Sequence, residues 1–237
     1  MGQLCHQRRS FARQSSMTMM PEGPEVRTLV DQLQGGVGRR LVDIQFLSGR
    51  YVNHGKPATF EAFASTMVPT FQPHSNIPQA IDIIQEWNAK GKFIYITLDD
   101  GNNPPPADDD DDDDNGDYQR SIWVTLGMTG HFVTEQVHKQ NPRSARWYIE
   151  LLDVDSMDSR KVYYHDRRNF GTLKFCRSRQ ELTKKLESLG LDILDPATTE
   201  GDFLAVVDKR KPELNVCKFL MDQSVRSRSS EAPYSYS

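Results

Sequence analysis

Hydrophobic positions early in the chain recur with a helical period. From Glu22 onward they are spaced three and four residues apart, which places them on one face of a helix of about a dozen residues. These positions are Val26, Leu29, Val30 and Leu33. Pro24 is tolerated in the first turn of such a helix, and the pair Gly35–Gly36 ends it.

Short runs of β-branched and aromatic residues, each bounded by turn residues, dominate the middle of the chain. They lie at 40–47, 79–87, 92–99, 121–128, 130–135, 145–152, 160–166 and 171–176. Short strands in such succession are typical of a sandwich. We therefore expect an α+β fold that is mainly β: a β-sandwich of about eight antiparallel strands, flanked by the N-terminal helix and a second helix.

The helical period returns near the C-terminus. The segments that show it are 178–190, 199–209 and 212–222. Residues 224–237 are polar, rich in serine and aperiodic, and we expect them to form a disordered tail.

An acidic, proline-rich stretch at 101–120 separates the third and fourth expected strands. It contains seven consecutive aspartates, Asp108 to Asp114. Such a composition cannot pack into a core, so we expect a disordered insertion that acts as a solvated spacer, not as a metal site. Without these seven aspartates the formal charge of −4 becomes +3, and a mildly basic body permits a nucleic-acid partner without implying one.

Composition excludes several other classes of protein. No stretch approaches the roughly 20 consecutive apolar residues of a membrane span, so we expect no membrane partner. Cys5, Cys176 and Cys217 are scattered and form no CxxC motif, which argues against a disulfide framework and against a zinc site. We expect no metal and no other cofactor, and a reducing compartment.

The first 20 residues differ from everything that follows. They contain Arg8, Arg9 and Arg13 and no acidic residue. This composition is similar to that of an organelle transit peptide, and equally to a leader added by an upstream start codon. In either case we expect residues 1–20 to lie outside the fold.

Four short motifs carry candidate chemistry. They are MPEGPE (20–25), NAKGKFIYITL (88–98), LGMTGHF (126–132) and HDRRNFGTLKF (165–175). Each alone is compatible with an ordinary helix start, strand entry or turn, but their identity, order and spacing together resemble the Fpg/Nei family of base-excision DNA glycosylases with AP-lyase activity. The resemblance continues through LGLDIL (189–194) and KFLMDQ (218–223), and Gly23 is more similar to the Nei side of the family.

The resemblance implies a set of catalytic residues. In the family the nucleophile is the secondary amine of an N-terminal proline, which places that role on Pro21, with Glu22 as the acid/base. Glu25 is implied to position the turn. Lys92 is implied to contact phosphate and assist catalysis, and Lys90 is a weaker candidate for the same place.

The resemblance also implies a double-stranded DNA partner that carries a damaged base or an abasic site. Extrusion of a base leaves a gap in the duplex, and the family fills this gap with residues that correspond to Met128, Arg168 and Phe170. Arg167 is a further DNA-binding candidate. We expect the protein to act as a monomer.

An internal proline cannot perform the chemistry that the resemblance assigns to Pro21. Its nitrogen belongs to a tertiary amide whose lone pair is delocalised into the carbonyl group. Two hypotheses restore the amine: translation that starts at Met20 followed by removal of that residue, which we favour, or proteolysis after Met20. We expect the nucleus as the location without residues 1–20, and the mitochondrion or a plastid if they are a transit peptide.

Differences from the family leave two function classes open. Relatives continue past KFLMDQ into a GNIY-type segment and the rest of a helix-two-turn-helix unit, so we expect a catalytic domain at 21–195 and an incomplete unit at 196–223, without the zinc finger of many relatives. Thr125 and Asn169 replace residues that are often basic in the family. One hypothesis is that the protein is a DNA glycosylase and AP lyase that acts on oxidised bases, with pyrimidine lesions favoured. The other is a catalytically inactive, truncated glycosylase-like DNA-binding domain.

Overall fold

The computed structural model describes residues 23–67, 82–99, 118–192 and 195–208. Helix α1 (Gly23–Leu33) is the predicted first helix, and its buried residues are the four that the periodicity selects. The 3-10 turn η1 (Gln34–Gly36) ends it. The sequence prediction for this element is confirmed.

All eight predicted strands are present. They are β1 (Arg40–Phe46), β2 (Ile83–Lys90), β3 (Phe93–Asp99), β4 (Tyr118–Thr125), β5 (His131–Thr134), β6 (Ala145–Leu152), β7 (Ser159–His165) and β8 (Thr172–Ser178). They form one antiparallel sheet in the order β5-β7-β6-β1-β2-β3-β4-β8. The predicted fold class, mainly β with flanking helices, is confirmed.

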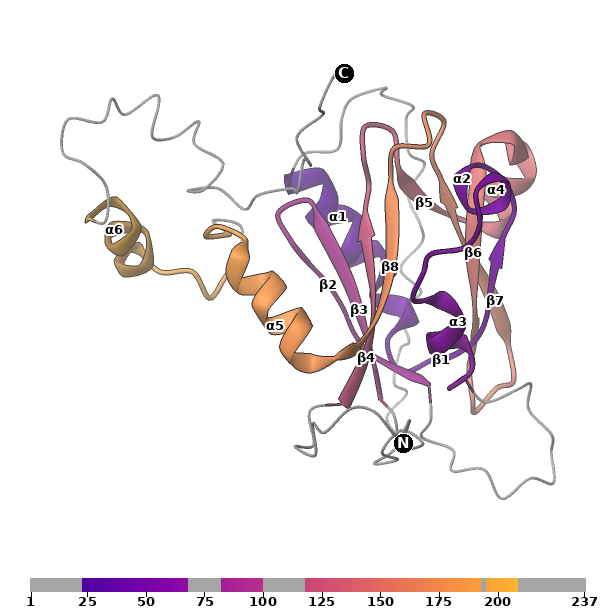
Figure 1. The fold of residues 1–237 in the computed structure, drawn as a ribbon, viewed down its shortest axis with the longest axis horizontal. Coiled ribbons are helices and arrows are strands. Elements are labelled where there is room, and N and C mark those ends of the chain that lie inside the picture. Colours follow the sequence, from indigo (N-terminus) through magenta and orange to yellow (C-terminus); the bar gives the residue numbers. More distant parts are fainter. Residues whose placement is uncertain (1–22, 68–81, 100–117, 193–194, 209–237) are drawn as a thin grey trace, which may run out of the picture.

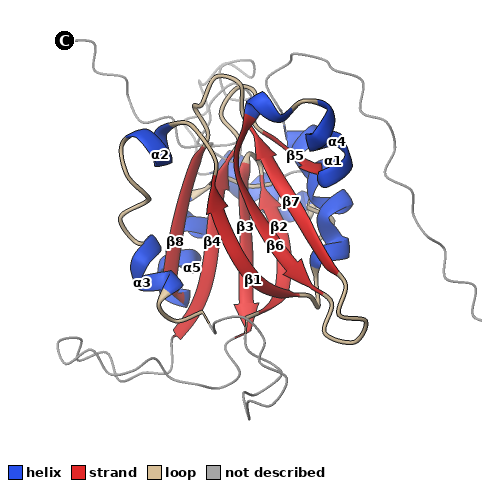
Figure 2. Ribbon diagram, turned by 90° about the vertical axis from the view of Figure 1, so that its right-hand side faces the viewer, coloured by secondary structure: helices blue, strands red, loops and turns tan. Residues whose placement is uncertain are grey.

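The sheet folds over on itself between β1 and β2. These two strands share a single register pair, Arg40 with Ile83, whereas the pairs on either side extend along most of each strand. The two halves therefore face each other, as Figure 2 shows, with β6 and β7 in front of β2 and β3. Trp87 of β2 meets Phe132 of β5 edge-on, with ring centroids 5.8 Å apart, and residues of both halves join one hydrophobic core.

Several strand boundaries differ from the prediction, among them the C-terminal ends of β2 and β4. β2 ends at Lys90 instead of residue 87, and β4 ends at Thr125 instead of residue 128. The second difference has a clear cause, because Gly127 has a φ of +61° and the Gly130 amide donates to the Leu126 carbonyl at 2.9 Å. Residues 126–130 are therefore a tight turn and not the end of a strand.

The helices beyond α1 include three that the sequence pattern did not predict. These are α2 (Arg50–Asn53), α3 (Phe60–Ala64) and α4 (Glu135–Gln140), which is followed by the 3-10 turn η2 (Pro142–Ser144). The predicted helices near 178–190 and 199–209 are α5 (Arg179–Ser188) and α6 (Glu200–Asp208). The predicted helix at 212–222 lies outside the described residues.

The second flanking helix, α5, covers part of the outer sheet face. The Ser178 side chain caps its N-terminus by accepting a hydrogen bond from the Glu181 amide at 3.2 Å. Leu182 and Leu189 pack there against Phe93 and Trp123 in a second hydrophobic cluster. Across the described parts of the chain, no helix is long and apolar enough to cross a membrane.

Residues 118–120, expected at the end of the acidic insertion, are the first three residues of β4. Arg120 is buried there and forms an ion pair with buried Asp82 at 2.6 Å. This pair holds the start of β4 in the sheet. The rest of the insertion, the leader 1–20, residues 209–223 of the expected helix-two-turn-helix unit and the tail 224–237 lie outside the described residues.

Candidate functional site

Three chain connections meet at one end of the sheet. Phe93 pairs with Thr125, and Thr125 pairs with Thr172, so these three residues lie side by side at the ends of β3, β4 and β8. The β2–β3 hairpin, the turn 126–130 after β4 and the loop 166–171 before β8 are therefore neighbours. Figure 1 shows the turn and the loop at the upper end of the sheet. Motifs far apart in the sequence are thus brought together.

The carboxylate of Asp166 organises the loop and joins it to the turn. It is buried and accepts hydrogen bonds from the Thr129 hydroxyl, from the Arg168 amide at 3.2 Å and from the Gly171 amide at 2.7 Å. The Arg168 amide also donates to Thr129 Oγ1 at 3.1 Å. One carboxylate therefore fixes both ends of the loop and its distance from the turn.

Tyr164 fills the space behind the turn and the loop. Its hydroxyl donates to the Leu126 carbonyl at 3.1 Å, and a Cβ on either Gly130 or Gly171 would overlap this hydroxyl. Burial raises the pKa of Tyr164 well above its usual value, so the phenol stays a neutral donor. The two glycines are required here for close packing.

Four predicted DNA-binding residues lie on this framework. Arg168 Nη1 lies 3.1 Å from Met128 Sδ, although 40 residues separate them in the chain. Phe170 is 46% exposed and is not part of the hydrophobic core clusters. Arg167 is exposed on the same loop. The structure brings these residues together at one surface, while their role in DNA binding stays a prediction.

The predicted lysines lie on the neighbouring hairpin. Lys90 Nζ donates to the Leu186 carbonyl at 2.8 Å, near the C-terminal end of α5, so its ammonium group has a structural partner. Lys92 is partly buried and directly precedes Phe93, the residue paired with Thr125. Lys92 therefore lies closer to the turn 126–130 than Lys90 does, because Lys90 belongs to β2, one strand farther from β4.

The N-terminal end of α1 lies beside the same hairpin. Arg27 donates to the Asn88 side chain at 2.9 Å, and it lies 3.5 Å from Asp192, which accepts the Gly91 amide at 3.1 Å. Glu25 is exposed in the first turn of α1. The predicted residues Pro21 and Glu22 lie outside the described residues, immediately before α1.

A cluster of histidines behind the loop was missed by the motif analysis. His138 Nδ1 lies 3.2 Å from His165 Nε2, and the His138 ring stacks on Tyr163 at 3.8 Å. Burial lowers the pKa of His165 to about 4, and the charges of His131, His138 and Arg146 contribute. The alternation of apolar and polar residues along β7 could not reveal this cluster, because its members come from three separate elements, β5, α4 and β7. Among the described residues, no group of histidines, cysteines and acids could hold a metal ion.

We expect the cluster to make stability depend on pH. The pKa of His165 is lower in the folded protein, about 4, than its ordinary value of 6.5, so protonation favours the unfolded chain. The free energy of unfolding should fall by up to about 3 kcal/mol as the pH drops from 6.5 towards 4. Urea unfolding across this range will measure it. His165→Gln should flatten the slope and the exposed control His54→Gln should not; an unchanged slope in His165→Gln would contradict the assignment.

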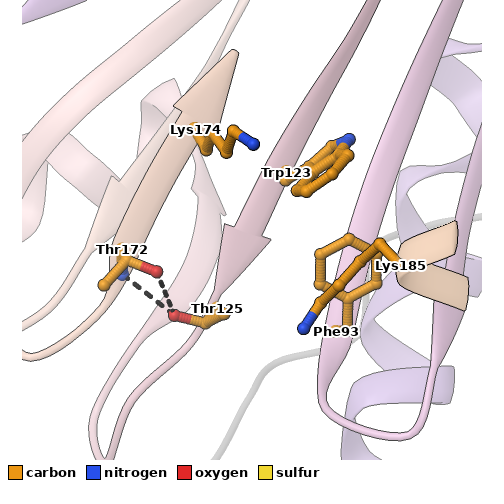
Figure 3. A pocket seen from close by; sticks show the side chains of 6 residues that line it. All are labelled: Phe93, Trp123, Thr125, Thr172, Lys174 and Lys185. Carbon is orange, nitrogen blue, oxygen red and sulfur yellow. Dashed lines mark hydrogen bonds between the residues drawn. The ribbon is translucent and has the colours of Figure 1, made fainter. Parts of the chain in front are cut away.

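A shallow groove with a volume of about 230 Å³ lies on the outer sheet face next to Thr125 and Thr172. Figure 3 shows two lysines beside its aromatic floor. Lys174 Nζ lies 4.5 Å from the Trp123 ring and pairs with Glu181, and Lys185 Nζ lies 5.5 Å from the Phe93 ring. Both ammonium groups thus lie within cation–π distance of an aromatic ring, and the charge of Lys174 is also paired with Glu181.

The sequence profile of the formamidopyrimidine-DNA glycosylase N-terminal domain matches residues 20–173. The chain belongs to the Fpg/Nei family. The match includes three of the four quoted motifs completely and all but the last two residues of the fourth. It confirms the resemblance that the motifs indicated.

Curated Fpg relatives are distant and longer than this chain. The chain is 24% identical over 209 residues to the formamidopyrimidine-DNA glycosylase of Salinispora arenicola, and 24% identical over 210 residues to that of Salinispora tropica. Each match covers 88% of this chain and 60% of the relative. The chain thus spans about three fifths of the length of these relatives.

Solved Fpg structures share the fold. One is MutM in complex with DNA that contains carbocyclic 8-oxo-G, with a TM-score of 0.54 and 20% identity, covering 87% of this chain and 64% of that one. Another is Lactococcus lactis Fpg in complex with DNA that contains an abasic site, with a TM-score of 0.54 and 19% identity, covering 87% and 62%. At this identity the likeness shows the fold alone.

Proposed function

We propose that this Fpg/Nei-family protein is a base-excision repair DNA glycosylase with AP-lyase activity on oxidised bases in double-stranded DNA. The observation that carries the proposal is the meeting of Met128 and Arg168 beside exposed Phe170, at the end of the sheet where the family motifs converge. The family match and the DNA complexes of its solved relatives support it. Residues 21–195 would be the catalytic domain, and the protein would act as a monomer in the nucleus, or in a mitochondrion or plastid if residues 1–20 are a transit peptide.

The projecting side chains suit a gap left by an extruded base. Met128 is flexible and apolar, so it can contact unstacked bases, and the planar guanidinium of Arg168 can hydrogen-bond the orphaned partner base while it stacks. Phe170 adds an aromatic wedge. These side chains stand on a turn and a loop that Asp166 and Tyr164 hold in place, so little ordering is required on binding.

The proposed chemistry uses the amine of Pro21. A new bond forms between this nitrogen and the sugar C1′ while the glycosidic bond breaks and the base leaves, and ring opening then gives an iminium. Glu22 would move protons at the opening deoxyribose ring. The iminium acidifies the C2′ hydrogen, whose removal expels the 3′ phosphate by β-elimination. Lys92 would hold a phosphate near the reaction, and Glu25 would position the turn that contains the nucleophile.

A second candidate is a catalytically inactive domain that binds DNA weakly. Thr125 and Asn169 occupy positions that are often basic in the family, and neither side chain carries the positive charge that pairs with phosphate. Thr125 Oγ1 in addition accepts the Thr172 amide at 3.1 Å. Fewer phosphate contacts mean lower affinity. Trapping of a covalent adduct separates the two candidates.

The wedge role of Met128 leads to a binding prediction. Met128→Ala should weaken binding to a duplex with an abasic site about tenfold, because the gap loses an apolar contact, and should leave binding to undamaged duplex unchanged. Fluorescence anisotropy at fixed salt will measure both affinities. Met157→Ala, at an exposed methionine on another turn, is the control. Equal affinity of Met128→Ala and the unmodified protein for abasic DNA would rule out the wedge role.

A further inference from the structure

Three backbone carbonyls of the loop 166–171 accept hydrogen bonds from arginines that lie outside every motif quoted above. Arg146, in β6, donates from Nε to the Asp166 carbonyl at 2.7 Å and from Nη2 to the Arg167 carbonyl at 3.2 Å. Arg50, in α2, donates to the Asn169 carbonyl at 2.6 Å. Two cations thus bind three carbonyls of the loop that carries Arg168 and Phe170.

The base of this clamp is itself fixed. Arg146 Nη1 donates to Ser48 Oγ at 2.9 Å, and the Leu47 and Ser48 amides donate to the Arg146 carbonyl. The guanidinium therefore has a separate partner on each of its three nitrogens. Its planar fork limits how the loop can move relative to β6.

The loop needs this support because of its own conformation. Asn169 has a φ of +58°, in the left-handed region that non-glycine residues rarely adopt. Its side chain packs against Gly49, where a Cβ would lie 2.6 Å from Asn169 Oδ1. Phe170 is exposed and is not anchored in the core. Hydrogen bonds, from the two arginines to the backbone and from the loop to the buried Asp166 carboxylate, therefore hold the loop in this conformation without an apolar anchor at Phe170.

We propose that Arg146 is a positioning residue for DNA insertion: it holds the loop 166–171 in the conformation that presents Arg168 and Phe170 to the gap. This inference rests on the proposed function. Arg146 acts through the loop, and it is the loop that contacts the DNA. Without the Arg146 side chain, the loop samples other conformations and must be ordered each time DNA binds. The preference for damaged over undamaged DNA then falls, while non-specific attraction to phosphate remains.

The first arm of the test measures the loop without DNA. In the full chain, Arg146→Met should speed hydrogen exchange at the Arg168 and Gly171 amides at least about tenfold, while amides in β3 stay protected. Arg146→Lys should be intermediate, because one ammonium can bind one carbonyl but not reproduce the fork. Arg160→Met, which removes an exposed arginine at the other end of β7, is the matched control and should behave as the unmodified protein.

The second arm measures insertion into DNA. With 2-aminopurine beside an abasic site, the fluorescence increase on binding reports unstacking by the wedge. Arg146→Met should lose about tenfold in the ratio of affinities for abasic and undamaged duplex, with a smaller fluorescence increase, while its affinity for undamaged duplex changes no more than in Arg160→Met.

The two arms separate the two proposals. Unchanged exchange at Arg168 and Gly171 in a folded Arg146→Met protein overturns the clamp, and so does an equal loss of discrimination in Arg160→Met. If the unmodified protein does not prefer abasic DNA, the proposed function fails, while the exchange arm still decides whether Arg146 orders the loop.

Discussion

A chain that begins at Pro21 will form a covalent adduct with an abasic duplex in the presence of borohydride, whereas the 237-residue chain will form none. The amide nitrogen of an internal proline has no available lone pair, so attachment of residues 1–20 abolishes attack. An α-amino group has an ordinary pKa of about 8, against about 10.4 for lysine, and is therefore partly unprotonated at neutral pH. Denaturing gels with labelled DNA will detect the adduct, and intact-mass analysis will verify each N-terminus.

Two variants of the Pro21-initiated chain make this result specific. Glu22→Gln should slow base release and strand cleavage by about a hundredfold or more, because it removes a general acid/base, without weakening DNA binding. Pro21→Gly replaces the secondary amine of the nucleophile with a primary amine and should therefore alter the lyase rate. An unchanged lyase rate in both variants would show that the site is assigned wrongly. A folded Pro21-initiated chain that forms no adduct would favour the inactive DNA-binding domain.

The second large effect is expected at Asp166. Asp166→Asn should lower the free energy of unfolding by about 3 kcal/mol, because an amide nitrogen would face N–H or O–H donors that now bond to a buried carboxylate. The resulting displacement of Arg168 and Phe170 should reduce adduct formation by the Pro21-initiated chain about a hundredfold. Urea unfolding and borohydride trapping measure the two effects.

A control at Asp155 distinguishes this effect from a simple loss of charge. Asp155→Asn removes an exposed carboxylate from the β6–β7 turn and should leave stability and trapping within error of the unmodified chain. If Asp166→Asn traps DNA as well as Asp155→Asn does, the loop does not depend on the buried carboxylate.

Local patterns determined the long elements of the fold. Helix α1 was predictable because its four buried residues recur on one face, and the strands because β-branched and aromatic runs end at turn residues. Helices α2, α3 and α4 have four, five and six residues, fewer than two turns, so no hydrophobic period can be read from them. Their positions depend on what they pack against, as when Phe60 meets Phe175 with ring centroids 5.0 Å apart.

The motifs alone were enough to indicate the family and to select the candidate site residues, because residue identity and order are properties of the sequence. Only the tertiary structure decided which of these residues meet. Met128 contacts Arg168 because β4 and β8 pair, and Lys90 bonds to the Leu186 carbonyl 96 residues away. The role of Arg146 is likewise invisible in the sequence, because its partners are backbone carbonyls, which every residue has and which no motif distinguishes.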